Sequence, residues 1–148
     1  HSDLRRQRQM CIRDSIISGV IFDPIKNEIF YADKNQGAYF NNHRIKVSKK
    51  MNIEECLFAT NKIGSSVDQL NCRITGSAAL DLAYVSSGRF DGYFQNNLNL
   101  WDIAAGILIV KEAGGIINEM NLTTHKNLNV AASSSEIYEK MIKLIPNF

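Results

Sequence analysis

Three small residues stand in the second half of the chain at a position where a helix is expected to begin. Gly76, Ser77 and Ala78 open an apolar run with helical spacing, which Thr75-Gly76-Ser77 is suited to cap and Gly88 is suited to end. The first N–H groups of a helix have no partner within the helix and lie at the positive end of its dipole. Small side chains let a ligand approach these groups, so the segment predicts a place where an anionic or polar ligand could bind.

A second helix start, Trp101-Asp102, supplies a carboxylate. An Asp at this position caps N–H groups and suits the helix dipole, so spacing alone predicts a capping role for Asp102. By the same standard Trp101 is expected to pack and Gln95 to be a surface amide. A role in catalysis or ligand binding stays open for all three residues at this stage.

Several familiar catalytic and binding patterns do not occur. The histidines fall in expected loops or near the N-terminus, so no Ser-His-Asp triad can be argued, and neither a phosphate-binding P-loop nor a dinucleotide fingerprint is present. The cysteines are odd in number and widely spaced, which suggests neither a metal site nor a disulfide framework and favours the reducing cytoplasm. The residues concerned are His1, His43, His125, Cys11, Cys56 and Cys72.

The overall composition is that of one medium-sized globular domain. The chain has 148 residues, of which 45% are hydrophobic and 22% charged, and this excludes a disordered or collagen-like protein. The longest apolar stretch, Ile103–Val110, is far shorter than the roughly 20 residues of a membrane span, so no membrane association is predicted. The formal net charge of +2 resides entirely in residues 1–14. The rest of the chain is therefore neutral, which argues against a nucleic-acid partner.

Residues 1–14, HSDLRRQRQMCIRD, differ from the rest of the chain. They show neither a helical stripe nor strand alternation, and they lack the apolar region of a signal peptide. We expect them to be a foreign or disordered leader. A basic arm for RNA or a membrane surface is the alternative.

The remaining residues predict an α/β protein. Residues 15–48 predict antiparallel hairpins, with β-branched runs separated by turns at Asp23-Pro24 and Asn41-Asn42. From residue 72 onward strands and helices alternate, which implies a layered sheet. The elements expected there are a helix over 78–85, a strand over 90–95, a helix over 101–113, strands over 116–120 and 129–132, and a helix beginning at 134–136.

Three segments resemble the inositol monophosphatase family, and the bacterial inositol-1-monophosphatase-like proteins most closely. They are GVIFDPIKNEIFYADKNQGAYFNNHRIKVS (19–48), RITGSAALDLAYVSSGRFDGYF (73–94) and WDIAAGILIVKEAGG (101–115), in the family's order. The resemblance covers about residues 15–148 and implies the family's layered α/β sandwich, here in truncated form. Residues 15–50 would be the end of an antiparallel sheet subdomain, and residues 51–148 would be the C-terminal α/β subdomain.

The resemblance also implies roles for individual residues. Asp102 matches the metal-binding Asp of the family's Trp-Asp pair, which also lies near the substrate hydroxyls. Gly76, Ser77 and Ala78 match the helix start that contacts the inositol ring. Gln95 stands where many members have a Glu that accepts hydrogen bonds from sugar hydroxyls, so its uncharged amide leaves the substrate preference open. The implied cofactor is Mg²⁺, the implied substrate is a small phosphorylated polyol such as inositol monophosphate, and the implied full-length protein is a homodimer.

The family's other metal ligands have no counterpart in this sequence. They lie in an upstream Glu-Glu pair and a DPIDGT-type motif, whereas Asp23-Pro24 is followed by Ile25-Lys26-Asn27 and corresponds to a later turn. Metal-assisted hydrolysis needs several converging carboxylates. We therefore expect the C-terminal portion of a Mg²⁺-dependent inositol-phosphate monoesterase that has no catalytic residue of its own and is inactive as given.

Two alternatives stay open. One is a phosphatase of the same superfamily that acts on nucleotide bisphosphates or another sugar phosphate. The other is a non-catalytic homologue that binds RNA or a protein.

Overall fold

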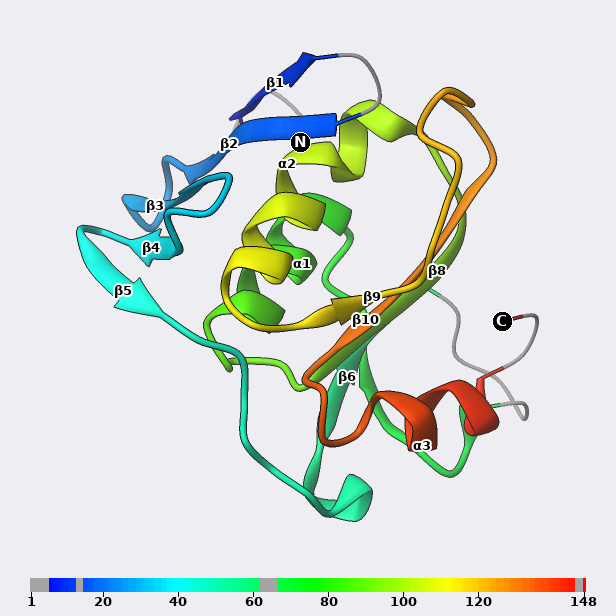
Figure 1. The fold of residues 1–148 in the computed structure, drawn as a ribbon. Coiled ribbons are helices and arrows are strands. Elements are labelled where there is room, and N and C mark those ends of the chain that lie inside the picture. Colours follow the sequence, from blue (N-terminus) through cyan, green and yellow to red (C-terminus); the bar gives the residue numbers. More distant parts are fainter. Residues whose placement is uncertain (1–5, 13–14, 62–66, 146–147) are drawn as a thin grey trace.

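Two five-stranded sheets enclose a pair of helices in the computed structural model, which describes residues 6–12, 15–61, 67–145 and 148 (Figure 1). The strands of the first sheet are β1 (Arg6–Ile12), β2 (Ser15–Asp23), β3 (Glu28–Asp33), β4 (Ala38–Phe40) and β5 (His43–Ile45). Those of the second are β6 (Leu57–Ala59), β7 (Asn71–Arg73), β8 (Gly92–Leu98), β9 (Ile116–Ile117) and β10 (Leu128–Ser133). The helices are α1 (Ala78–Ser86), α2 (Leu100–Glu112) and α3 (Tyr138–Leu144), with a short 3-10 turn, η2, at Ile53–Glu55.

The first sheet is an antiparallel meander in the order β1-β2-β3-β4-β5, which confirms the hairpins expected over residues 15–48. Asn41 and Asn42 both have positive φ values, 42° and 70°, as a tight turn between β4 and β5 requires. Along β2, buried residues alternate with partly exposed ones, so that one face of the strand is directed into the core.

Strand β1 lies within residues 1–14, so residues 6–12 of the expected foreign or disordered leader form a strand, while the foreign origin of the leader stays a prediction. Arg6–Ile12 pairs antiparallel with β2 over the strand's whole length, with a register shift between Met10 and Cys11. A strand edge offers unpaired N–H and C=O groups to any extended backbone, so pairing does not need side-chain alternation in the added strand. The expected leader residues 1–5 and 13–14 lie outside the described residues.

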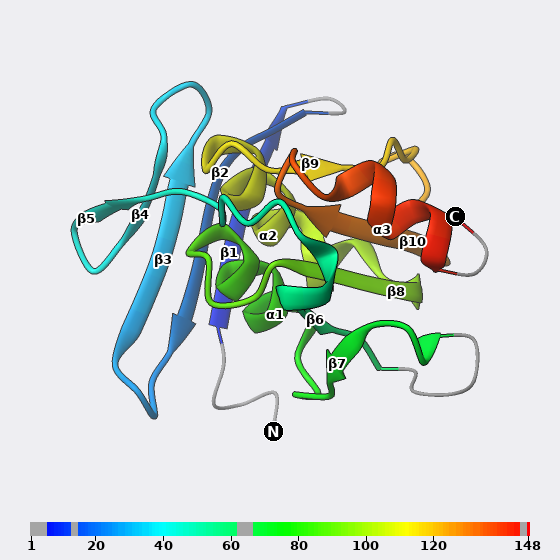
Figure 2. The same ribbon diagram turned by 90° about the horizontal axis from the view of Figure 1, so that it is seen from below.

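Helices α1 and α2 lie between the two sheets (Figure 2). This position explains the apolar run Ile103–Val110, because a helix covered by structure on all sides is apolar all round. Two glycines allow this close packing, because a side chain at either position would clash with its neighbour. A Cβ at Gly106 would lie 2.6 Å from Leu82 Cβ on α1, and one at Gly19 would lie 2.9 Å from Ala105 Cα. Strand β2, α2 and α1 therefore approach one another closely at these two positions.

The second sheet has the order β7-β6-β8-β10-β9 and mixes parallel with antiparallel pairs. Helix α3 covers its other face, where Phe58 and Phe94 of the sheet pack with Met141 in a second apolar cluster. The observed strands and helices match the predicted α/β layers, with three differences. β7 was not expected, β9 is shorter than predicted, and α3 begins at Tyr138 rather than at 134–136. Among the described residues, none of the helices has the length and apolar character needed to cross a membrane.

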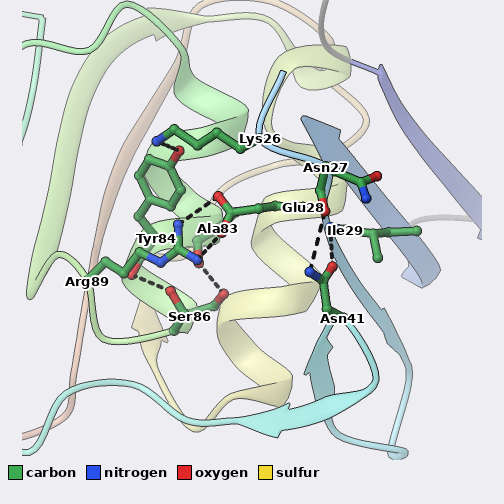
Figure 3. Close-up of polar contacts among 10 residues, drawn as sticks. Lys26, Asn27, Glu28, Ile29, Asn41, Ala83, Tyr84, Ser86 and Arg89 are labelled. Atoms are coloured by element: carbon green, nitrogen blue, oxygen red, sulfur yellow. Dashed lines mark hydrogen bonds and ion pairs between the residues drawn. The ribbon is translucent and has the colours of Figure 1, made fainter. Parts of the chain in front are cut away.

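A polar cluster joins the first sheet to the helical layer (Figure 3). The Arg89 guanidinium, just after α1, donates to both carboxylate oxygens of Glu28 on β3. Beside it, the Lys26 ammonium lies 3.2 Å from the Tyr84 hydroxyl. The cluster ties the β2–β3 hairpin to α1, the helix that carries Gly76-Ser77-Ala78 at its start. The predicted subdomain boundary at residue 50 falls between the two sheets and stays a prediction.

Candidate functional site

The start of α1 has the geometry that its sequence predicts. Ser77 is the N-cap residue, and its hydroxyl oxygen accepts a hydrogen bond from the Leu80 N–H at 3.3 Å. Gly76 has a φ of +84°, a left-handed conformation that favours glycine. A Cβ at Gly76 would meet no atom within 4 Å, so the backbone of this turn is open to an approaching molecule. Ala78 is the first residue of the helix.

A buried carboxylate holds this turn against the helix. The Thr75 hydroxyl donates to Asp81, which is only 3% exposed, and the Thr75 oxygen accepts from the Ser77 N–H at 3.4 Å. The loop before α1 is thereby anchored to the first turn of the same helix. Such an anchor limits the freedom that Gly76 would otherwise give the loop.

Strand β8 contributes Tyr93 and Gln95, which stand two residues apart and so share one face of the strand. Tyr93 is fully buried, and its hydroxyl donates to the Gln95 side-chain oxygen Oε1 at 2.5 Å. Burial raises the pKa of the Tyr93 phenol well above its usual range, and the negative charges of Asp81 and Asp102 raise it further. The phenol therefore stays protonated at physiological pH and remains a hydrogen-bond donor.

Asp102 lies in the first turn of α2, but it is not the N-cap residue. That position belongs to Asn99, whose C=O accepts from the Asp102 N–H at 3.0 Å. The half-buried Asp102 carboxylate suits the positive end of the helix dipole, so the expected electrostatic role stands while the capping role does not. The neighbouring Trp101, which is expected to pack, is 49% exposed.

Residues of three elements act on the Tyr93 hydroxyl. It bonds Gln95 on its own strand, and it senses the charges of Asp81 on α1 and Asp102 on α2. Of the residues expected from the sequence, Gln95 contacts Tyr93 directly, whereas Asp102 acts on it through its charge. Hydrogen bonds through Thr75 link Gly76-Ser77-Ala78 to Asp81.

From the sequence Thr75 was given a capping role only, and Asp81 and Tyr93 were missed as members of this constellation. Two periodicities could have indicated them. Asp81 follows Ser77 by four residues and so lies one helical turn on, and Tyr93 precedes Gln95 by two residues on the same strand face. The expectation that Gln95 is a surface amide is wrong, because its oxygen is bound to a buried phenol.

The metal-ligand chemistry of the described residues is incomplete. They contain no group of three or more His, Cys, Asp or Glu side chains that could hold a metal ion. Mg²⁺ prefers carboxylate oxygens and needs near-octahedral coordination. Asp102 offers one carboxylate at this site, which does not by itself make a magnesium site.

Comparison with known proteins places this constellation in context. Residues 10–147 match the model of the inositol monophosphatase family. The chain is 38% identical over 144 residues to Nus factor SuhB of Haemophilus influenzae, and 37% identical over 138 residues to a fructose-1,6-bisphosphatase/inositol-1-monophosphatase of Thermotoga maritima. Each alignment covers 86% of this chain and 54% of the relative, so the chain spans about half the length of these relatives.

Solved structures show the same fold. The Thermotoga maritima IMPase superimposes with a TM-score of 0.85 at 35% identity, over 93% of this chain and 59% of that one. The SuhB protein of Bartonella henselae gives a TM-score of 0.81 at 36% identity, over 90% and 57% of the two chains. The layered α/β architecture expected from the sequence is thereby confirmed.

Proposed function

Because the chain belongs to the inositol monophosphatase family, we propose that the full-length protein hydrolyses the phosphate ester of a small polyol or sugar. The observation that carries this proposal is the hydrogen bond that holds Gln95 against Tyr93, a phenol on whose pKa the charges of Asp81 and Asp102 also act. A helix start open at Gly76 supplies N–H donors, and Gln95 and Asp102 supply polar side chains that can orient an alcohol.

We propose that the substrate's polyol lies against this constellation. In that arrangement Gly76, Ser77 and Ala78 present the backbone of the α1 start, while Gln95 contacts an oxygen of the ring. Each of these groups holds or orients the alcohol and none of them attacks phosphorus. We propose that these residues bind the substrate and that the catalytic groups belong to the part of the relatives' length that this chain does not span.

Magnesium dependence is also part of the proposal, with Asp102 as one of the metal ligands. When bound, Mg²⁺ activates a water molecule and stabilises the charge that develops on the phosphate and the leaving oxygen. Because Asp102 is one carboxylate where several are needed, we propose that the 148-residue chain alone has no activity. The full-length protein is proposed to be a homodimer.

The test is a phosphatase assay on two purified proteins, the 148-residue chain and the full-length protein. Inositol 1-phosphate, fructose 1,6-bisphosphate and a nucleotide bisphosphate are offered with and without Mg²⁺. We expect Mg²⁺-dependent turnover of at least one compound by the full-length protein and none by the 148-residue chain. Turnover by the 148-residue chain that disappears in Asp102→Asn would show that its own residues complete the metal site.

A binding role without catalysis is the second candidate. Relatives 36–38% identical to this chain carry the name Nus factor SuhB rather than the name of an enzyme. Failure of the full-length protein to hydrolyse any of these compounds would favour this candidate. Capture of RNA or a protein by the full-length chain, retained in Asp102→Asn, would support it directly.

A further inference from the structure

The orientation of the Gln95 side-chain amide is set by a hydrogen bond within the protein. A Tyr hydroxyl has one proton to donate, and an amide has an oxygen that accepts and an NH₂ group that donates. The Tyr93 hydroxyl gives its proton to Gln95 Oε1 at 2.5 Å. The amide oxygen thereby faces the buried phenol, and the NH₂ group at the other end of the amide is the donor that the side chain can offer to a ligand.

The surroundings keep the amide in this orientation. Tyr93 is fully buried, so water does not compete for its hydroxyl, whereas Gln95 is only half-buried and can reach a bound molecule. If the amide were turned over, its NH₂ group would face the phenol, and the Tyr93 proton would have to find another acceptor. The orientation therefore rests on the hydrogen bond from the buried phenol to the amide oxygen.

We propose that Gln95 presents a hydrogen-bond donor to the ligand, so that this position of the site binds a neutral oxygen that accepts a hydrogen bond even where that oxygen cannot donate one. The matching substrates are phosphate monoesters of sugars or polyols that place an ether, ring or carbonyl oxygen opposite Gln95. A hydroxyl also fits, because its oxygen can accept, but its proton is not needed. Tyr93 acts as a positioning residue, since it reaches the ligand only through Gln95. This inference rests on the proposed function, because it assumes that the alcohol of a phosphate ester binds at Gln95.

Gln95→Glu is the informative substitution because it changes polarity with almost no change of shape. A carboxylate at this position accepts hydrogen bonds only, so it still binds a hydroxyl but repels an ether oxygen. The probes are inositol 1-phosphate and its methyl ethers, each methylated at one ring hydroxyl. Any steric effect of the methyl group is the same for Gln and Glu and cancels when the two proteins are compared.

We expect one methyl ether to separate the two proteins in KM. For each protein we compare the KM of this ether with the KM of inositol 1-phosphate. The ratio of ether KM to inositol 1-phosphate KM should be about tenfold larger in the full-length Gln95→Glu protein than in the wild type, while the corresponding ratio of kcat values should change little. Tyr93→Phe leaves the amide free to turn, so its discrimination between ether and hydroxyl should fall between those of the other two proteins. Gln36→Glu, an exposed position in the β3–β4 turn, and Tyr138→Phe on α3 are the matched controls and should behave as wild type.

A measurement without ligand tests the orientation independently of any activity. In NMR spectra of the 148-residue chain, the Gln95 Nε2 protons should show no strong nuclear Overhauser effect to the Tyr93 ring protons that flank its hydroxyl. A strong effect would place the NH₂ group against the phenol and overturn the inference. A second result would also overturn it: both proteins hydrolyse inositol 1-phosphate, and for every ether the ratio of ether KM to inositol 1-phosphate KM is the same in wild type and Gln95→Glu. If no protein hydrolyses any probe, it is the proposed function that fails, while the spectrum still decides the orientation of Gln95.

Discussion

Arg89 offers the sharpest test of how the first sheet is held to the helical layer. Its guanidinium donates to both carboxylate oxygens of Glu28, with an Nη1–Oε1 distance of 2.9 Å (Figure 3). Its Cζ atom also lies over three aromatic rings, 4.9 Å from the centroid of Phe40, 5.0 Å from that of Tyr84 and 5.5 Å from that of Phe30. Replacing Arg89 by Met keeps most of the apolar stem and removes both interactions.

The expected loss of stability is about 2 kcal/mol. The side chains of Arg89 and Glu28 are 36% and 13% exposed, so the pair is partly screened by water, and its two-pronged geometry contributes about 1 kcal/mol. A cation over aromatic rings at a half-exposed site contributes about another 1 kcal/mol, and the three rings share one cation, so their effects do not add in full. For a domain of this size, 2 kcal/mol corresponds to a fall in Tm of about 4–8 °C.

Denaturant unfolding of four proteins measures the pair itself: wild type, Arg89→Met, Glu28→Gln and the double variant. The double-mutant cycle should give a coupling free energy of about 1 kcal/mol between the two side chains. Arg89→Lys keeps the charge but not the fork, so it should recover about half of the loss. The control is Arg73→Met, at an exposed position on β7, which should leave the free energy of unfolding within about 0.5 kcal/mol of wild type.

The coupling should depend on pH in a direction that the structure determines. The hydrogen bond from Arg89 lowers the pKa of Glu28, and the charges of Arg89 and Lys26 lower it further against the opposing effect of burial. A carboxylate whose folded pKa is lowered stabilises the protein fully above its unfolded pKa, about 4.3, and this stabilisation is lost as the pH falls through the folded pKa. A coupling that is absent at pH 7, or one that persists unchanged at pH 2.5, would refute this account of the cluster.

Three further substitutions test the site and the core. Asp102→Asn in the full-length protein removes a negative charge from a half-buried helix start. Activity should fall about 100-fold or more and the Mg²⁺ requirement should rise, while Tm changes little. Near-normal turnover at ordinary Mg²⁺ would show that Asp102 is no metal ligand. Ser77→Ala removes the N-cap bond to Leu80 and should reduce the free energy of unfolding by about 1 kcal/mol, as measured by denaturation. Gly106→Val places a side chain where even a Cβ would lie 2.6 Å from Leu82. The free energy of unfolding, measured with urea, should fall by about 3 kcal/mol. An unchanged free energy of unfolding would mean that α1 and α2 can move apart.

The elements that local sequence determines were predicted well. Strand alternation with Asn41-Asn42 at a turn predicts the β2–β5 meander, and the same positions have the positive φ values that such a turn needs. Ser77 predicts the start of α1, and its side chain caps that helix. In each case the signal and the structure involve residues that are close in the chain.

The elements that depend on a partner were not predicted. Strands β1 and β7 lack a periodic apolar pattern and exist by pairing with β2 and β6, which is a property of the neighbouring strand's free edge. The eight-residue apolar run in α2 similarly predicts that this helix is buried. Which elements cover the helix depends on the arrangement of the two sheets, which the run itself does not predict.

In the candidate site too, some features follow from the local sequence and others depend on a neighbouring residue. Residue types predict that Gln95 carries both a donor and an acceptor, and from the sequence alone either could serve a ligand. The deciding contact comes from Tyr93, which by type and burial is an ordinary core residue of a strand. Its single hydroxyl proton turns the amide oxygen toward the phenol, so that the NH₂ group is the end offered to the ligand. The specificity expected at this position therefore depends on a buried neighbour that touches no ligand, and a substitution at Tyr93 should change which oxygen is recognised without changing any residue that contacts the substrate.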